Sequence, residues 1–235
     1  MNQHTFKRFE DELNLLKSKT VSMGGLVEKA VRRSMKALMN YDQKRATKVI
    51  ERDRAINALE VEIDEMTRSL LALRQPAASD LRLVIATIKI VTDLERCGDL
   101  AEGIAEYALK VHEHPHAHMD SLEVLSDRVL QQVKSALDAF TYDDVNAALQ
   151  TIENDKRINK QYKAIERENL TYMLEDPRYI SSGMMVAAIS KNLERIGDHA
   201  VNISEMVIYK VKGHDVRHVD HATAERLVSG ELDAE

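Results

Sequence analysis

Apolar residues recur every three or four positions along most of this chain, which is the spacing of an amphipathic helix rather than a strand. Taking about 100° per residue, Val84, Ile88 and Val91 fall on one side of a helix, and Arg82 and Lys89 fall on the other. The same spacing extends through six segments, approximately residues 6–39, 42–73, 79–112, 119–140, 143–174 and 180–211. The pattern therefore predicts an all-α protein of six long helices.

Three prolines support these boundaries, because proline lacks a backbone donor and ends or kinks a helix. Pro76 follows the second segment, Pro115 lies between the third and the fourth, and Pro177 follows the fifth. With only 8 Gly, 3 Pro and no Trp, the composition also disfavours a turn-rich β architecture. Short turns place consecutive helices alongside each other, so we expect antiparallel bundles.

The second half of the chain repeats the first. The string ERDRAIN at 51–57 recurs as ENDKRIN at 153–159, an offset of 102, and LERCGDLA at 94–101 recurs as LERIGDHA at 193–200, an offset of 99. This duplication predicts two pseudo-symmetric antiparallel three-helix bundles joined near Pro115. The expected units are residues 1–114 and 115–212, followed by a polar C-terminal tail at 213–235.

The chain carries 33 Lys and Arg against 39 Asp and Glu, a formal net charge of −6, so nucleic-acid binding is not expected. No stretch approaches the roughly 18 consecutive apolar residues of a membrane span, and residues 1–12 lack the apolar region of a secretory signal. The single Cys97 cannot form an internal disulfide, which is typical of a reducing compartment. We therefore expect a cytoplasmic protein.

The repeated string carries a Glu-x-x-x-Asp pair, Glu95 with Asp99 and Glu194 with Asp198. Residues four apart project from one face of a helix, so each pair can direct two carboxylates at a common point. Glu95 lies among the apolar positions of its helix, and Asp99 lies at their edge. Ionised carboxylates near a packed interior are costly unless cations, protons or basic partners compensate them. Both a metal site and a buried Glu–Arg network satisfy this requirement.

The second helix of each unit adds further oxygen ligands at the same spacing, Asp53 and Asn57 in the first unit and Asp155 and Asn159 in the second. Carboxylate and amide oxygens suit hard cations such as Mg²⁺, Mn²⁺ or iron ions, and the chain offers no thiolate cluster for structural zinc. The sequence therefore favours an oxygen-rich metal site between the second and third helices of each unit.

The strings LERCGDLAEGIAE at 94–106 and LERIGDHAVNISE at 193–205, with QPAASDLR at 75–82, resemble the PhoU family of phosphate-signalling regulators. The likeness covers nearly the whole chain, including FKRFEDELNLLKSKTVSMGGLVEKA at 6–30. It implies a six-helix homodimeric adaptor, not an enzyme, that represses the phosphate regulon when phosphate is plentiful. The implied partners are the PstB ATPase of the PstSCAB phosphate transporter and the PAS region of the PhoR sensor histidine kinase, which acts on the response regulator PhoB. Contact with the membrane would be through these partners only.

The resemblance also implies metal clusters bound through the Glu-x-x-x-Asp motif, with the ion left open among Fe, Mn, Mg and Zn. Carried over residue by residue, the ligands are Glu95, Asp99, Glu194 and Asp198, supported by Asp53, Asn57, Asp155 and Asn159. Asparagine stands at positions 57 and 159 where the family usually has an acidic residue, which would lower the charge of each site. Val201 occupies the position that corresponds to Glu102, so the two units are expected to differ.

Two other functions stay open at this point. A carboxylate-bridged di-metal enzyme of the helical-bundle type would need Glu-x-x-His pairs, and the chain offers only Glu113-x-x-His116, with Pro115 inside it. A metal-free structural scaffold is the other alternative. The alternating histidines at 112, 114, 116 and 118 are expected to form a solvated linker rather than a ligand set.

Overall fold

The computed structural model describes residues 2–113 and 119–231, and these residues contain no β-strand. The α-helices are α1 (Asn2–Met39), α2 (Gln43–Arg74), α3 (Ala78–Lys110), α4 (Asp120–Tyr142), α5 (Val145–Glu175), α6 (Ile180–Lys212) and α7 (His221–Ser229). Short 3₁₀ turns occupy Val111–Glu113 and Pro177–Tyr179. The predicted all-α fold is confirmed, and the six expected helices lie close to their predicted bounds. The expected unit boundary at 114/115, with Pro115, lies outside the described residues.

The two bundles use the same turn between their first and second helices. After α1, Tyr41 adopts a left-handed conformation (φ 55°), and Asp42 caps α2 by accepting a hydrogen bond from the backbone N–H of Arg45 at 2.9 Å. After α4, Asp143 (φ 58°) and the capping Asp144 repeat this arrangement. Residues of α1 and α4 near these turns therefore correspond at the same offset of 102 that relates α2 to α5.

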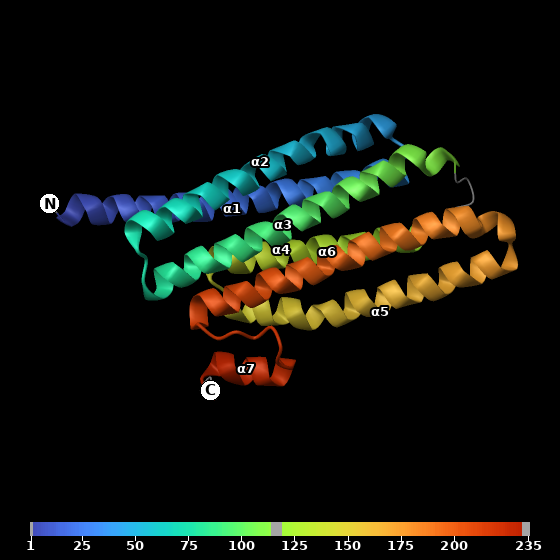
Figure 1. Cartoon of the computed structure of the whole chain (residues 1–235). Helices are drawn as coiled ribbons and strands as arrows, with labels where there is room; N and C mark the ends of the chain where they lie inside the picture. Colours follow the sequence, from blue (N-terminus) through green and yellow to red (C-terminus); the bar gives the residue numbers. More distant parts are fainter. Residues whose placement is uncertain (1, 114–118, 232–235) are drawn as a thin grey trace.

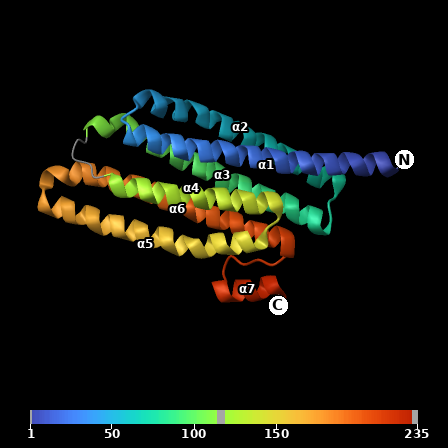
Figure 2. The same ribbon diagram turned by 180° about the vertical axis from the view of Figure 1, so that it is seen from behind.

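The helices pack as two three-helix bundles, α1–α3 and α4–α6, which lie side by side (Figures 1 and 2). We refer to them as the first and second bundle. Helix α3 packs against α6, and α1 packs against α4, so one hydrophobic core runs through both bundles. Leu16, Ile56 and Leu94 are buried in the first bundle, and Leu193 is buried in the second. Each such side chain contributes roughly 1.5–3 kcal/mol on burial, so packing dominates the stability of the fold.

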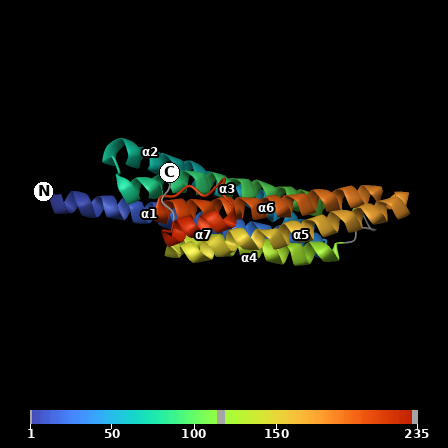
Figure 3. The ribbon, with the colours of Figure 1, turned by 90° about the horizontal axis from the view of Figure 1, so that it is seen from below.

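The seam between α3 and α6 lies at the junction of the two bundles (Figure 3). Asp93 Oδ1 on α3 accepts a hydrogen bond from Asn202 Nδ2 at 3.0 Å and lies 2.8 Å from His199 Nδ1. A side chain larger than hydrogen at Gly103 would place its Cβ 3.1 Å from Asn192 Nδ2, so glycine permits the close approach of the helices. His199 is therefore a residue of this seam.

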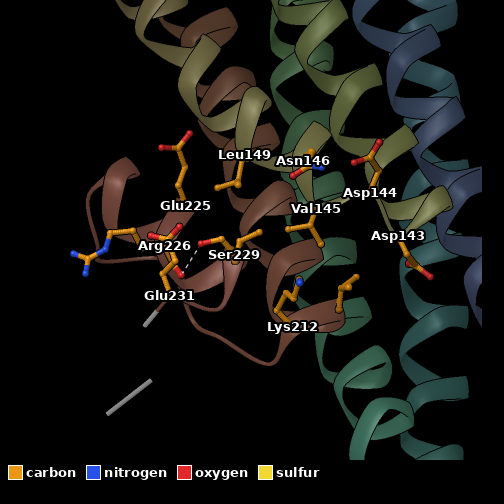
Figure 4. Close-up of a pocket in the computed structure, with 12 residues that line it drawn as sticks. Asp143, Asp144, Val145, Asn146, Leu149, Lys212, Glu225, Arg226, Ser229 and Glu231 are labelled. Carbon is orange, nitrogen blue, oxygen red and sulfur yellow. Dashed lines mark hydrogen bonds between the residues drawn. The ribbon is translucent and has the colours of Figure 1, made fainter. Parts of the chain in front are cut away.

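Helix α7 lies in the segment that the sequence predicts only as a polar tail. It packs against α5, where His221 Nε2 lies 3.7 Å from Glu153 Oε2. A cavity of about 720 Å³ lies between α7, the turn before α5 and the end of α6, and both acidic and basic side chains line it (Figure 4). None of the described helices is long and apolar enough to cross a lipid bilayer.

Candidate metal centre

Helices α2 and α3 bring three carboxylates together in the first bundle. Asp53 projects from α2, and Asp99 and Glu102 project from one face of α3, with one oxygen of each residue within 4.8 Å of the others. Asp53 is buried, Glu102 is half-buried and Asp99 is exposed, so the group opens to solvent at one side. Among the described residues it is the only group of three metal-ligating side chains this close together.

Asp53 is the buried member of this group, with 7% of its surface exposed. Its Oδ2 accepts a hydrogen bond from Asn57 Nδ2 at 2.8 Å, whereas its Oδ1 is buried and has no hydrogen-bond partner among the described residues. Burial raises the pKa of Asp53, and the charge of Asp99 adds to this increase. A Cβ at Gly98 would lie 3.0 Å from this Oδ1, which explains the glycine inside the motif. One buried carboxylate oxygen is thus left without a donor.

Two more carboxylates surround this group, Glu95 on α3 and Glu60 on α2. Burial is the main cause of the raised pKa of each, and the charge of Asp99 contributes to both. The one cation within 4.0 Å of Glu95 among the described residues is Arg96, at 3.6 Å and with 60% of its side chain exposed. The alternative to a metal site was a buried Glu–Arg network between the helices. No such network is present in the described part of this site. The negative charge of this acidic group between α2 and α3 is therefore largely uncompensated by protein groups.

The second bundle carries the same motif but compensates it with its own side chains. Asp155 Oδ1 accepts a hydrogen bond from Gln132 Nε2 at 3.1 Å, and Gln132 Nε2 also donates to the backbone oxygen of Gly197 at 3.3 Å. Lys191 Nζ lies 2.7 Å from Glu194 Oε2. The oxygen that has no partner in the first bundle therefore has one in the second.

Three differences between the repeats account for this contrast. The corresponding residues, from the first repeat to the second, are Ala30 and Gln132, Thr92 and Lys191, and Glu102 and Val201. The first change adds an amide donor, the second adds a cation, and the third removes a carboxylate. All three make the second site closer to neutral, so the duplicated motif forms two electrostatically unequal sites.

The first-bundle ligands predicted from the sequence come together only in part. Asp53 and Asp99 belong to the group of three, whereas Glu95 lies beside it. Asn57 turns its amide nitrogen toward Asp53 and acts there as a hydrogen-bond donor. Glu102 completes the group, although sequence reasoning did not select it as a ligand. Its position three residues after Asp99, on the same face of the helix, was the signal that could have identified it.

The predicted residues of the second bundle also lie near one another. Asn159 Nδ2 donates to Asp155 Oδ2 at 2.6 Å, which repeats the Asn57 contact of the first bundle. Partial burial, together with the charges of Glu194 and Asp155, raises the pKa of Asp198 to about 6. A raised carboxyl pKa means that protons compensate part of this cluster at mildly acidic pH.

The fold and the site together define a class of protein: a duplicated, all-helical chain that holds an acidic motif between the second and third helices of each repeat. The PhoU domain model matches this chain twice, at residues 20–108 and 122–207. The chain belongs to the PhoU family.

Curated relatives and solved structures agree with this assignment. The chain is 41% identical over 229 residues to the phosphate-specific transport system accessory protein PhoU of Serratia marcescens, covering 97% of this chain and 94% of that protein. It is 38% identical over 231 residues to the Escherichia coli K12 protein of the same name, covering 98% and 96%. The crystal structure of PhoU from Pseudomonas aeruginosa superimposes with a TM-score of 0.84 at 44% identity, covering 88% of this chain and all of that one. A phosphate transport system regulatory protein PhoU from Streptococcus pneumoniae gives 0.83 at 31% identity, covering 88% and 99%.

Proposed function

We propose that this chain regulates phosphate uptake and phosphate-starvation signalling as an adaptor between the PstSCAB transporter and the PhoR sensor kinase. In this proposal it is a cytoplasmic homodimer that contacts PstB and the PAS region of PhoR and represses the phosphate regulon when phosphate is plentiful. The names of its full-length relatives, which describe accessory proteins of a phosphate-specific transport system, support the role in phosphate transport.

The proposed output is a protein contact rather than a chemical reaction. Cys97 is fully buried, and burial raises the pKa of its thiol, so this residue is unsuited to act as a nucleophile. The alternative of a di-metal enzyme rests on Glu113-x-x-His116, and His116 lies outside the described residues. Oxygen consumption by iron-loaded protein would favour that alternative.

The proposal includes a metal site in the first bundle, and the unpartnered Oδ1 of Asp53 is the observation that carries it. This oxygen is buried, and it belongs to a carboxylate that has one oxygen within 4.8 Å of oxygens of Asp99 and Glu102. A donor set made only of carboxylate oxygens fits Mn²⁺, Mg²⁺ or ferrous iron better than a softer ion. A cation held there would neutralise the surrounding acids and satisfy Asp53. In the second bundle, Gln132 and Lys191 already meet these needs, so we propose that cation binding there is weak.

Paired variants test whether the first bundle holds the principal site. Asp53→Asn with Asp99→Asn should remove most of the Mn²⁺ retained after dialysis, as measured by elemental analysis. Asp155→Asn with Asp198→Asn is the matched control, and it should retain nearly the parent content. Circular dichroism should show normal helicity in both proteins. Equal losses in the two variants would contradict the assignment, and unchanged content in the first would place the metal elsewhere.

Co-purification from cells tests the adaptor role. The tagged chain should recover PstB and PhoR, and deletion of its gene should abolish phosphate-dependent repression of the regulon. If repression persists after deletion and neither partner is recovered, the adaptor proposal is wrong. Loss of metal from the Asp53 and Asp99 variant with normal repression would separate metal binding from the regulatory contact.

A further inference from the structure

A groove of about 350 Å³ lies between α1 and α2, and we term it the α1–α2 groove. It is lined by Leu26, Lys29, Ala30, Arg33, Val49, Arg52, Ala55 and Ile56. A corresponding groove of about 440 Å³ lies between α4 and α5, and we term it the α4–α5 groove. Each of the eight residues that line the first has a counterpart 102 positions later in the lining of the second. The duplication therefore provides an internal reference for the chemistry of the α1–α2 groove.

The two grooves differ in charge. The α1–α2 groove contains three cations and no acid, and its cations are Lys29, Arg33 and Arg52. Their counterparts in the α4–α5 groove are uncharged: Gln131, Ser135 and Asn154. That second groove instead balances two arginines, at 128 and 157, with Asp127, so its lining carries a single net positive charge. The strong positive charge is therefore specific to the first bundle.

The three groove cations, Lys29, Arg33 and Arg52, form no ion pair with a carboxylate in the described part of the chain. In contrast, nearby Arg32 pairs with Glu28 on α1, and Arg45 pairs with Asp42, the cap of α2. Residues 28–54 contain nine Lys and Arg against four Asp and Glu, although the whole chain has a net charge of −6. Like charges held together without partners repel one another, so an anionic ligand at this groove would relieve the repulsion.

The groove also has an apolar floor. Val49 and Ile56 are buried at its base, and Leu26, Ala30 and Ala55 add partly exposed apolar surface. A small hydrated anion such as phosphate would gain nothing from this floor. A flat membrane surface would reach the flanking cations but not the recessed base. An acidic protein segment that carries apolar side chains matches both features.

We propose that the α1–α2 groove is a docking site for an acidic segment of a partner protein, with apolar side chains seated on Val49 and Ile56 and acidic groups paired with Lys29, Arg33 and Arg52. The proposal does not depend on metal binding. Arg52 and Asp53 are neighbours on α2, but Arg52 lines the groove whereas Asp53 faces α3. The two sites therefore occupy different faces of the same helix.

The α4–α5 groove supplies substitutions that the fold already accepts at equivalent positions. The groove variant combines Lys29→Gln, Arg33→Ser and Arg52→Asn. Its control combines Lys160→Gln, Lys163→Ser and Arg167→Asn, three exposed cations of α5, and so has the same net charge. The probe is a labelled synthetic helical peptide with leucines on one face and glutamates on the other, and binding is measured by fluorescence anisotropy at low salt.

The groove variant should bind the acidic peptide about tenfold more weakly than the parent, and the control should bind within about twofold of it. The reverse graft, Gln131→Lys with Ser135→Arg and Asn154→Arg, should raise the stoichiometry from one peptide to two. Equal weakening in the groove variant and its control would overturn the proposal, as would absence of peptide binding by the parent. Competition by millimolar inorganic phosphate would assign the groove to the free anion. Preferential binding to vesicles containing phosphatidylglycerol, lost in the groove variant, would assign it to a membrane surface.

Discussion

Ala30 corresponds to Gln132 of the second bundle. Ala30→Gln should therefore give the first acidic site the amide donor that the second site already has. In the second bundle, Gln132 donates to Asp155 Oδ1 at 3.1 Å. Ala30→Gln would place the same amide near Asp53 Oδ1, which has no partner in the parent. Ala30 borders the α1–α2 groove, so a longer side chain has room to enter.

The magnitude follows from the new hydrogen bond and its costs. A hydrogen bond to a charged group contributes about 1.5–3 kcal/mol, and ordering the glutamine side chain costs up to about 1.5–2 kcal/mol. The metal-free variant should therefore be more stable by about 1 kcal/mol, a rise in Tm of about 2–4 °C for a chain of this size. A cation must displace the new bond and forfeit this stabilisation of about 1 kcal/mol, so Mn²⁺ affinity should fall by about fivefold.

The measurements are thermal unfolding in chelator and calorimetric titration with Mn²⁺. Ala30→Met is the control, because it fills the same space without an amide donor. In the second bundle, Gln132→Ala should have the reverse effect, lowering the stability of the metal-free protein and strengthening Mn²⁺ binding. If Ala30→Gln binds Mn²⁺ as the parent does, or if Ala30→Met weakens binding equally, then compensation of Asp53 does not explain the inequality of the two sites.

Two other predictions concern stability. Burial raises the pKa of Glu205 to about 7, so the folded protein binds a proton that the unfolded chain releases above pH 4.5, and stability should decrease as pH rises from about 4.5 to 7. Glu205→Gln should therefore stabilise the protein by about 1–2 kcal/mol at pH 8, a figure discounted for the partial exposure of the side chain, and should have no such effect at pH 4. Unfolding in urea at both pH values measures this difference. Equal effects at the two pH values would show that protonation of Glu205 does not control stability. Gly98→Ala should destabilise the protein by about 1–3 kcal/mol, because the new methyl group would lie 3.0 Å from Asp53 Oδ1 and 3.2 Å from Ile56. An unchanged urea midpoint of unfolding would show that α2 moves away from the methyl group at no cost.

The helices and their pairing could be predicted because each depends on a regular pattern. The apolar spacing fixed the helical segments, and the repeated strings at 94–101 and 193–200 showed that the bundles are related. Helix α7 was missed because its nine residues carry few apolar positions and follow a polar segment. Its start depends on Asp220, whose side chain accepts a hydrogen bond from the backbone N–H of Thr223 at 2.9 Å. Such a local cap is a weak signal without the α5 surface on which the helix packs.

The inequality of the two acidic sites was harder to predict. The motif itself is nearly identical in the two repeats, and the sequence revealed only the replacement of Glu102 by Val201. Gln132 donates the hydrogen bond that satisfies Asp155 Oδ1, and it lies on another helix, more than twenty positions earlier in the chain. No periodicity within α5 or α6 identifies it, because the contact depends on how α4 packs. Hydrogen-bond compensation between helices is a property of packing and not of the motif.

The first bundle contains two groups of like charges that lack compensating protein groups, whereas the second bundle compensates or lacks the corresponding charges. On one side of α2, Asp53 Oδ1 has no donor among the described residues, and several acids lie together. On the other side, Lys29, Arg33 and Arg52 line the groove with no ion-pair partner in the described part of the chain. Replacing these groups by neutral ones would be expected to stabilise an isolated fold, since like charges repel and a buried unpaired oxygen is costly. The second bundle has the same helical frame and keeps the acids of the motif, but it has neutral residues in place of Glu102 and of the three groove cations, so the frame does not require those charges. Ligands that bind the first bundle are therefore the simplest physical explanation for charges that the fold itself would be more stable without.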